Sequence, residues 1–585
     1  GLGRPAALPA ADAPAPDPAA PAELPPTDLQ ALVAAIREAA ERLDDYVPQP
    51  SPWLPALEEQ VLLDDLPPVG DDVPAGGVRP IPYALEDVPQ LQQRRVATVN
   101  LATFGHLYVI GAPRSGRTQV LRTIAGSAAR TVSSADVHIY AIDAGGGGLA
   151  ALEALPHCGA VVSRHDVERM ERLLNRLAAE LTERQERCSD RGVAGLGELR
   201  AAVPARERPA HILLLIDGWD ALVNVLDEHD NGRMMDLFTR LLREGAAMGL
   251  HVIATSERSL LGGRFAAHND HKLMLRQAER TDYQLIGMLP SAVPASIPPG
   301  RGWHALSGTE TQVALLAPGT AGQEQVEALR EIGAEATRRD AKVPAERRPF
   351  RVAALPRSVE FAALYERVPA ELRRPMWGLL GMGGDDAGPI GVDFAGSSPV
   401  FGVLGPPRTG RSNTLAALSV SLLAGGTSLV VLTPRDSPLR SLARHPQARV
   451  LTDPDPSEEL VTRTLESLPG PRVVVIDDAD LLGLPACDRV LKEIVVSGRD
   501  RGVGLVYGAP ADAMQLALGS WVTAAKRARS GLLLAPKALA EGEWIGARIP
   551  VNLIRSTPPV GRGYTTSPTG ELMAVQVPLT VLRTD

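Results

Sequence analysis

One short pattern occurs twice in this chain of 585 residues and constrains its fold more than any other feature. Gly111 to Thr118 reads GAPRSGRT, and Gly405 to Ser412 reads GPPRTGRS. Both have the spacing of a phosphate-binding loop, in which backbone N–H groups and the start of the next helix hold a polyphosphate. In both copies arginine stands where the pattern has lysine. The repeat predicts two nucleotide-shaped modules and leaves open whether they hydrolyse nucleotide.

The residues around each loop fit the strand, loop and helix order that the pattern requires. His106–Ile110 and Val400–Leu404 are short apolar runs that lead into the two loops. Each loop is followed by an apolar strand that ends in aspartate, Ile212–Asp217 in the first copy and Arg472–Asp477 in the second. An aspartate at this position of a P-loop protein helps to hold Mg²⁺ against the nucleotide phosphates.

Apolar runs alternate with helical stretches in both halves, which is typical of a parallel α/β sheet. A long charged helix is expected from about residue 166 to 190. The fold class is therefore α/β, with tandem P-loop domains that each contain a mainly parallel sheet flanked by helices. The further runs that we expect to form strands are Val137–Asp143, Leu250–Thr255, His271–Leu275, Ser428–Leu432, Gly504–Tyr507 and Gly531–Leu534.

The two halves are copies of one unit. The loops lie 294 residues apart, whereas Asp217 and Asp477 lie 260 apart. A later motif, PPGRG at 298–302, recurs as PVGRG at 559–563, 261 residues further on. The second copy is thus 34 residues shorter between loop and aspartate, around the long charged helix. We expect the copies to have diverged in function.

Composition sets the expected boundaries. A stretch rich in Pro and Ala predicts a semi-extended linker at the start of the chain. Thr27 and Asp28 then open a helix that runs to Glu41 and packs on the domain that follows. The expected parts are a linker at 1–26, a helical connector at 27–56, a first domain at 57–336, a linker at 337–356 and a second, shorter, degenerate domain at 357–585.

Bulk properties narrow the classes of function. A net charge of −9 and a pI near 5.8 disfavour a protein that binds a nucleic-acid backbone over a broad surface. Three cysteines without C-x-x-C spacing predict free thiols in a reducing compartment. No run is apolar over the 18 residues that a membrane span requires. The chain begins with Gly, so we expect a longer protein whose N-terminal region anchors it to a membrane.

The residues that hydrolysis requires are incomplete. The carboxylate that orients the attacking water usually follows the strand-end aspartate. That position holds Gly218 in the first copy and Asp478 in the second. Asp478 is one methylene shorter than the usual glutamate and is the candidate catalytic residue. Asp220 and Asp480 lie slightly further along and are alternatives.

The sequence leaves two interpretations open for His157 and for a set of four arginines. His157, in the turn Leu155 to Gly159, is either a ligand or switch or, as we favour, part of a structural turn. Near the strands that follow the strand-end aspartates lie arginines that either face a neighbouring subunit or are solvated at the surface: Arg243, Arg258, Arg499 and Arg501.

The nucleotide and its metal are expected at both loops. Arg117 and Arg411 keep the positive charge of the usual lysine on a bulkier planar group, and they contact phosphate or turn to solvent or to Asp217 and Asp477. The expected nucleotide-binding residues are Gly111, Ala112, Pro113, Arg114, Ser115, Gly116, Arg117, Thr118, Gly405, Pro406, Pro407, Arg408, Thr409, Gly410, Arg411 and Ser412. The expected Mg²⁺ ligands are Thr118, Asp217, Ser412 and Asp477.

Taken in order, these motifs resemble the FtsK/SpoIIIE family of motor ATPases. The most specific part of the resemblance is HIYAIDAGGGGL followed closely by LPHCGAVV, together with LLLIDGWD, REGAAMGLHVIATSER and PPGRG. It covers residues from about 27 to 578 and points to the EccC branch of actinobacterial type VII secretion and its FHA-linked relatives. It implies tandem RecA-like domains, ATP and Mg²⁺, ring assembly, and a catalytic domain upstream of degenerate ones.

The sequence departs from an active member of that family. Arginine replaces lysine twice, Gly218 replaces glutamate, and Glu257 stands where DNA translocases tend to have glutamine. We therefore expect regulatory and substrate-recognition modules of an EccC-like secretion motor, with weak or no hydrolysis, at the cytoplasmic side of a membrane. The expected partners are an upstream catalytic ATPase domain, further copies in a homo-oligomeric ring and a secreted helical protein. The alternatives are an FtsK-type DNA translocase, in which DNA is the partner, and a scaffold that binds no nucleotide.

Overall fold

Two sheets of ten strands with the same strand order form the core of the chain. The computed structural model describes residues 27–43, 47, 54–70, 73–228, 232–396, 398–482, 486–516, 520–555, 557–567 and 570–582. The first sheet has the order β2-β1-β10-β9-β8-β3-β7-β6-β4-β5, and the second has β12-β11-β20-β19-β18-β13-β17-β16-β14-β15. Position by position the two orders are the same, which confirms the internal repeat and the tandem α/β fold.

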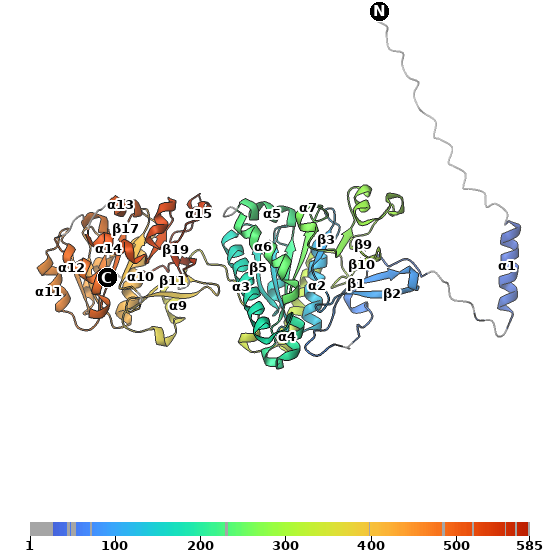
Figure 1. Cartoon of the computed structure of the whole chain (residues 1–585), viewed down its shortest axis with the longest axis horizontal. Helices are drawn as coiled ribbons and strands as arrows, with labels where there is room; N and C mark the ends of the chain where they lie inside the picture. The colour runs from blue at the N-terminus through green and yellow to red at the C-terminus, as the bar shows by residue number, and fades with distance from the viewer. Residues whose placement is uncertain are drawn as a thin grey trace, which may run out of the picture. The chain divides into compact units, whose positions relative to one another are not determined.

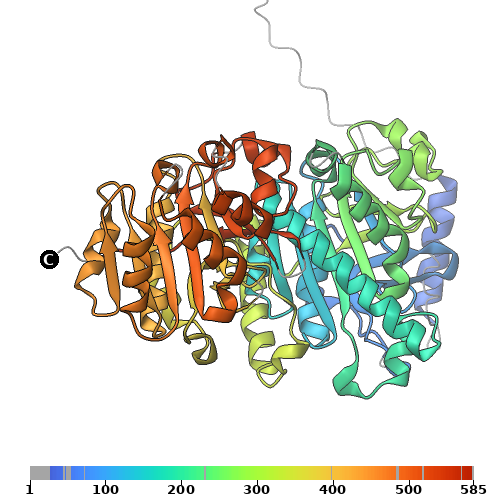
Figure 2. The same cartoon turned by 60° about the vertical axis from the view of Figure 1, so that its left-hand side comes forward.

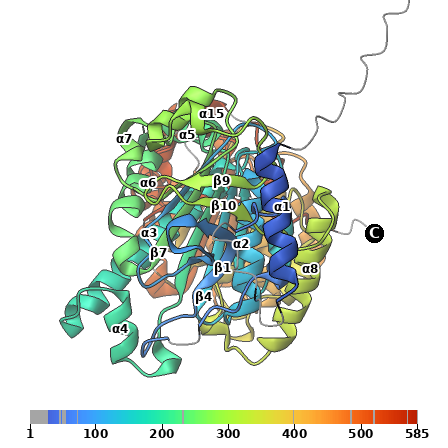
Figure 3. The ribbon, with the colours of Figure 1, turned by 90° about the vertical axis from the view of Figure 1, so that its right-hand side faces the viewer.

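The first sheet is parallel from β8 to β5, and the strands beyond β8 are antiparallel from β9 to β1. Figure 3 shows β1, β9 and β10 side by side. Its strands are β1 (Ile81–Val88), β2 (Gln93–Val99), β3 (Leu107–Ile110), β4 (Val137–Asp143), β5 (Cys158–Ser163), β6 (His211–Asp217), β7 (Leu250–Ser256), β8 (Lys272–Leu275), β9 (Arg301–His304) and β10 (Glu310–Val313).

Helices cover both faces of this sheet. Apolar residues of α2 and α8 pack on one face, and those of α3, α4, α5 and α6 pack on the other. Figure 1 shows α3, α5 and α6 gathered beside the sheet. The helices are α2 (Arg117–Thr131), α3 (Val167–Arg191), α4 (Leu196–Ala202), α5 (Trp219–Glu228), α6 (Arg233–Glu244), α7 (Gly263–Ala266) and α8 (Gly322–Arg339).

The second sheet repeats this design with α10 on one face and with α12 and α14 on the other. Figure 2 shows helices around the orange and red strands of this sheet. Its strands are β11 (Trp377–Gly383), β12 (Gly388–Asp393), β13 (Val400–Leu404), β14 (Ser428–Leu432), β15 (Ala448–Leu451), β16 (Arg472–Ile476), β17 (Val503–Ala509), β18 (Gly531–Leu534), β19 (Arg562–Thr566) and β20 (Leu572–Gln576). Its helices are α9 (Phe361–Glu366), α10 (Arg411–Ala424), α11 (Glu458–Glu466), α12 (Asp488–Ser497), α13 (Ala511–Leu516), α14 (Ser520–Ala528) and α15 (Val551–Arg555).

The shorter spacing of the second copy has a clear structural cause. The charged helix α3 has 25 residues, whereas its counterpart α11 has nine. The second copy therefore keeps every strand, and its shorter helix gives 16 of the 34 missing residues. The described segment between α11 and β16 also has no counterpart of α4.

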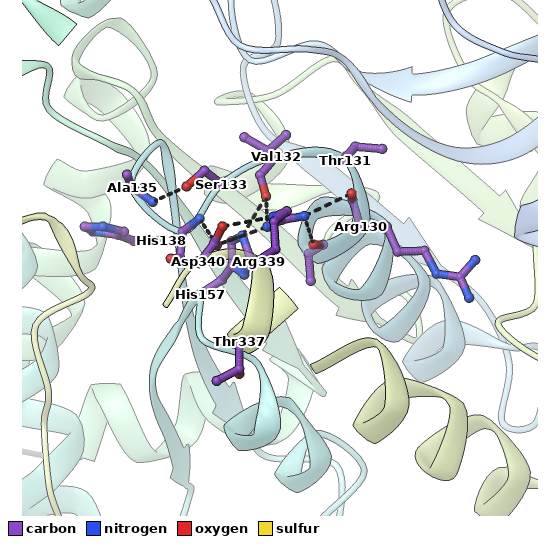
Figure 4. A network of polar contacts seen from close by, with 12 residues as sticks. Arg130, Thr131, Val132, Ser133, Ala135, His138, His157, Thr337, Arg339 and Asp340 are labelled. Atoms are coloured by element: carbon purple, nitrogen blue, oxygen red, sulfur yellow. Dashed lines mark hydrogen bonds and ion pairs between the residues drawn. The ribbon is translucent and has the colours of Figure 1, made fainter. Parts of the chain in front are cut away.

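The linker expected from residue 337 begins later in the structure, because α8 continues to Arg339 and is held on the first domain. Arg339 Nη1 donates to the carbonyls of Ala129 and Arg130, at 2.8 and 3.1 Å. Asp340 Oδ2 accepts from the backbone N–H of Ser134 at 2.7 Å. Figure 4 shows this network at the end of α2. Residues 337–340 therefore belong to the first domain.

The expected helix after Thr27 is present as α1 (Asp28–Glu41), which lies outside the compact unit that carries both sheets. Thr27 and Gln30 form a capping box at its start. Its packing on the first domain remains a prediction, and the Pro/Ala-rich stretch at 1–26 lies outside the described residues. Among the described helices, none is long and apolar enough to cross a membrane.

Candidate nucleotide-binding sites

Both Gly-rich loops adopt the same backbone conformation. Gly116 and Gly410 have φ of +104° and +111°, a region that favours glycine. Arg114 and Arg408 also have positive φ, +62° and +65°. Helices α2 and α10 begin at the residue after the second glycine, and in the described structure no side chain caps either first turn. The backbone N–H groups of both first turns are thus available to a ligand.

The recurring GRG motif contacts these two loops, which gives it a structural role in both domains. The N–H of Gly300 donates to the carbonyl of Ser115 at 2.9 Å, and the N–H of Gly561 donates to the carbonyl of Thr409 at 3.0 Å. A Cβ atom on Gly116 would lie 3.0 Å from the nitrogen of Gly300. The turn of this motif thus packs closely against the second glycine of each loop.

In the first domain two hydroxyl groups bind the strand-end aspartate. Thr118 Oγ1 donates to Asp217 Oδ2 at 2.7 Å, and Thr255 Oγ1 donates to Asp217 Oδ1 at 2.6 Å. Thr255 Oγ1 also accepts from the backbone N–H of Gly218 at 2.8 Å. The predicted metal ligands Thr118 and Asp217 are therefore adjacent.

The run of four glycines lies directly over this pair. Asp143 Oδ1 accepts from the N–H groups of Gly145, Gly146 and Gly147 at 3.1–3.2 Å, and Oδ2 accepts from Leu149 at 2.7 Å. Side chains would not fit here, since a Cβ atom on Gly145 would lie 2.9 Å from Asp217 Oδ2 and one on Gly148 would lie 2.7 Å from Thr118 Cγ2. The glycines allow the backbone to close over the site.

The second domain builds its aspartate site differently. Ser412 Oγ donates to Asp477 Oδ1 at 3.2 Å, and Ser437 Oγ donates to Asp477 Oδ2 at 2.7 Å. Ser437 follows β14, where the first domain has its glycine run. Burial raises the pKa of Asp477 above its ordinary value. Both predicted metal pairs, Thr118 with Asp217 and Ser412 with Asp477, are thus brought together.

The two loop arginines contact carboxylates other than the strand-end aspartates. Arg117 Nη2 lies 3.4 Å from Glu257 Oε1. Arg411 Nη2 donates to Asp478 Oδ1 at 3.1 Å, and its Nη1 donates to the carbonyl of Gly405 at 3.3 Å. The alternative in which these arginines turn to Asp217 and Asp477 is not what the structure has, and their contact with phosphate remains a prediction.

The candidate catalytic positions have unusual backbones. Gly218 has φ of +83°, and Asp478, at the same place in the second domain, has φ of +53°. Asp220 is bound to the end of β7, where its carboxylate accepts from Ser256 Oγ and from the N–H of Glu257. Burial would raise the pKa of Asp220, but these donors and Ser259 lower it below its ordinary value. Asp220 is thus an ionised structural acceptor.

The remaining candidates have structural or surface roles. His157 is buried in its turn, and its Nε2 lies 3.0 Å from the carbonyl of Val132. Arg243, Arg258 and Arg501 pair with nearby carboxylates and keep more than half of their side chains exposed. Burial raises the pKa of Cys158 to about 12 and that of Cys487 to about 11, which makes both thiols unreactive.

Four residues at the two sites were not predicted from the sequence: Asp143, Thr255, Ser437 and Arg122. Arg122 Nε donates to the carbonyl of Gly148 at 2.8 Å. Only Asp143 has a local signal, because it ends a strand immediately before a glycine run. Thr255 and Ser437 approach their aspartates only through the pairing of β4, β6 and β7 and of β14 with β16.

Comparison with known proteins gives one family and a group of relatives. Residues 84–261 match the model of the FtsK/SpoIIIE family. Over 561 residues the chain is 29% identical to the ESX-4 secretion system protein EccC4 of Mycobacterium tuberculosis. This alignment covers 90% of this chain and 42% of that protein. The chain spans less than half the length of this and similar curated relatives.

Solved structures share the fold of both domains. ATPases 2 and 3 of EssC from Geobacillus thermodenitrificans align with a TM-score of 0.67 and 18% identity, covering 90% of this chain and all of that one. ATPases 2 and 3 of Thermomonospora curvata EccC, solved in complex with a signal sequence peptide, align with a TM-score of 0.59, 22% identity and the same coverage.

Proposed function

We propose a function from one premise: residues 84–261 form a domain of the FtsK/SpoIIIE family, and the homologues of this chain are EccC and EssC proteins of type VII secretion systems. On this premise, the two domains bind ATP and act as regulatory and substrate-recognition modules of a secretion motor, with weak or no hydrolysis. The observation that carries the proposal is the repeated loop with its adjacent hydroxyl and aspartate.

The loops fit a polyphosphate. In each loop no side chain caps the start of the helix, and the second glycine has a positive φ that favours glycine at that position. Ser115 Oγ is buried and has no hydrogen-bond partner among the described residues, so a polar group of a ligand would satisfy it. Residues 111–118 and 405–412 would hold the phosphates.

The hydroxyl and aspartate pairs fit Mg²⁺ that arrives with a nucleotide. Mg²⁺ in nucleotide sites is held by one or two protein carboxylates together with phosphate oxygens and water. Thr118 with Asp217, and Ser412 with Asp477, would supply such ligands. A bound ion would neutralise charge on the phosphates, and these side chains would hold it in place.

Weak hydrolysis follows from the positions next to these aspartates. Gly218 offers no carboxylate to a water molecule, and Asp220 is engaged by the end of β7. The remaining candidates, Asp478 and Asp480, both lie in the second domain, and the carboxylate of Asp478 is paired with Arg411. We therefore assign slow turnover, where it occurs, to the second domain.

The partners are proposed by analogy with the relatives. One related structure contains a signal sequence peptide, and we infer that a secreted helical protein is the substrate here. We further propose an upstream catalytic ATPase domain, a homo-oligomeric ring and a position at the cytoplasmic side of a membrane.

The second domain offers an open groove of about 970 Å³ beside α14 and Leu539–Trp544, with basic residues Lys526, Arg527, Arg529 and Arg548 in its lining.

Titration of the full chain with a fluorescent ATP analogue, with and without Mg²⁺, tests the nucleotide part of the proposal. We expect binding at submillimolar concentration that is tighter with Mg²⁺, and hydrolysis near background that duplex DNA does not stimulate. The absence of binding at submillimolar nucleotide would assign both domains a purely structural role. Hydrolysis that rises on addition of DNA would favour a DNA translocase instead.

A further inference from the structure

The two loop arginines pair with carboxylates that lie at different positions in the two domains. In the first domain Arg117 pairs with Glu257, which follows β7, and in the second domain Arg411 pairs with Asp478, which follows β16. The sheet registers identify the equivalent positions. Ile216 pairs with Ala254 and Ile476 pairs with Tyr507, so the place of Glu257 is taken by Pro510 in the second domain.

The two arginines are similarly buried, at 18% exposure for Arg117, but the carboxylate of the second pair is much less exposed than that of the first. Glu257 exposes 58% of its side chain, whereas Asp478 exposes 23% and Arg411 exposes 13%. The distances agree with this difference, at 3.4 Å for the first pair and 3.1 Å for the second. An exposed pair at the longer distance contributes little, and a half-buried pair with a further hydrogen bond contributes more.

Arg411 is also bound to the loop itself. Its Nη1 donates to the carbonyl of Gly405, the first residue of the loop, while Nη2 donates to Asp478. The guanidinium group therefore bridges the two walls of the space in which the pattern places phosphates. A phosphate group that draws this guanidinium group towards itself has to break at least one of these bonds.

The charged residues around the two loops also differ at aligned positions. Arg122 of the first domain donates to the carbonyl of Gly148 above the site, and the aligned position of the second loop helix, 294 residues on, is Ala416. Next to the strand-end aspartate, the first domain has the uncharged Gly218, whereas the second has the carboxylate of Asp478. The second site thus lacks the additional arginine of the first, and the carboxylate beside its loop follows β16 instead of β7.

We propose that the Arg411–Asp478 pair is a lock on the second phosphate-binding loop, so that nucleotide binds first to the loop of the first domain. This inference rests on the proposed function, because it assumes that both loops take a polyphosphate. The lock keeps the second loop free of nucleotide until the pair opens. It also keeps the carboxylate of Asp478, the candidate catalytic residue, paired with Arg411 until that moment.

Removal of the Asp478 carboxylate tests the lock in the full chain. In Asp478→Gly the second domain acquires the residue of the first at a position with positive φ, where glycine is favoured. Asp478→Asn keeps the size of the side chain, and asparagine also tolerates this conformation. Photo-crosslinking with 8-azido-ATP, followed by peptide mapping, measures the occupancy of each loop separately.

In the wild-type chain we expect the first loop to be labelled at lower nucleotide concentration than the second. Both Asp478 variants are expected to raise the affinity of the second loop about tenfold or more, without a change at the first. The matched control is Asp500→Asn, an exposed carboxylate of the same domain, which is expected to leave both loops unchanged. Glu257→Gln is expected to change the first loop less than about threefold.

Two results separate the failure of the lock from the failure of the proposed function. Labelling of the first loop, together with a second loop that responds to neither Asp478 variant, would overturn the lock alone. A folded chain in which neither loop is labelled, in the wild type or in any variant, would overturn the proposed function on which it rests. Circular dichroism and thiol accessibility of buried Cys487 report whether the second domain of each variant is folded.

Discussion

Arg301 and Arg562 bind the chain in the same way at the ends of the two domains. Arg301 Nε donates to Gln312 at 2.8 Å, and Arg562 Nε donates to Gln576 at 3.1 Å. Each then binds the segment that enters its own domain through two backbone carbonyls: Leu57 and Glu58 in the first, Leu355 and Pro356 in the second. Each GRG motif therefore joins a phosphate-binding loop to the start of its domain.

Loss of Arg301 is expected to destabilise the first domain. The side chain is buried and its guanidinium also pairs with Glu310 at 2.6 Å, so Arg301→Ala leaves several buried acceptors without a donor. We expect a loss of about 2–4 kcal/mol in the free energy of unfolding. Urea unfolding monitored by thiol labelling and peptide mapping measures this, because Cys158 and Cys188 report the first domain and Cys487 reports the second.

The control for this variant is Arg258→Ala. Arg258 pairs with Asp282 but exposes 70% of its side chain, so its removal is expected to cost less than about 0.5 kcal/mol. Equal effects of the two substitutions would show that the bonds of Arg301 to Leu57 and Glu58 add no stability.

Asp143 is expected to hold the glycine run over the first site. Asp143→Ala removes the acceptor of four backbone N–H groups, and we expect a loss of about 2–4 kcal/mol in the stability of the first domain. Hydrogen exchange of residues 145–149 is expected to become faster even where the domain stays folded. The exposed Asp270→Ala serves as the control, and unchanged exchange in the Asp143 variant would contradict the role given to this carboxylate.

Much of the parallel half of each sheet could be predicted from the sequence, because β4, β6, β14 and β16 are continuous apolar runs. The antiparallel half was missed. β9 and β10 have four residues each and include Arg301 and Glu310, so their polar side chains conceal the strand pattern. These charges are tolerated because they pair with each other inside the domain. The partners of Arg117 and Arg411 also required the sheet registers, since they lie 140 and 67 residues away.

The hydroxyl of Thr118 is expected to support the Mg²⁺-dependent part of nucleotide binding. Thr118→Val keeps the shape of the side chain and removes the donor to Asp217. We expect about tenfold weaker binding of nucleotide in Mg²⁺ and little change in EDTA. Isothermal titration in the two buffers measures both affinities. The matched Ser412→Ala variant in the second loop is expected to have a smaller effect on total binding, and a loss in EDTA as large as that in Mg²⁺ would argue against a metal role for Thr118.

The first domain is expected to be the acid-sensitive one. Burial lowers the pKa of His138, His157 and His251 to about 4, and all three lie in the first domain. In the unfolded chain histidine titrates near 6.5, so between pH 6.5 and 4 the unfolded state binds protons that the folded state does not. Stability is therefore complete above about pH 6.5 and falls as the pH decreases, by up to about 1.4 kcal/mol per pH unit for each histidine.

The second domain contains a single histidine, His445, so this source of acid sensitivity is largely confined to the first. We expect the urea midpoint reported by Cys158 to decrease steeply between pH 6.5 and 4.5, and the midpoint reported by Cys487 to decrease much less. Labelling with 4,4′-dithiodipyridine, which reacts with thiols at acidic pH, measures both in one sample. His157→Gln is expected to flatten the first slope by up to about 1.4 kcal/mol per pH unit. Parallel shifts of the two midpoints would contradict the assignment of acid sensitivity to these buried histidines.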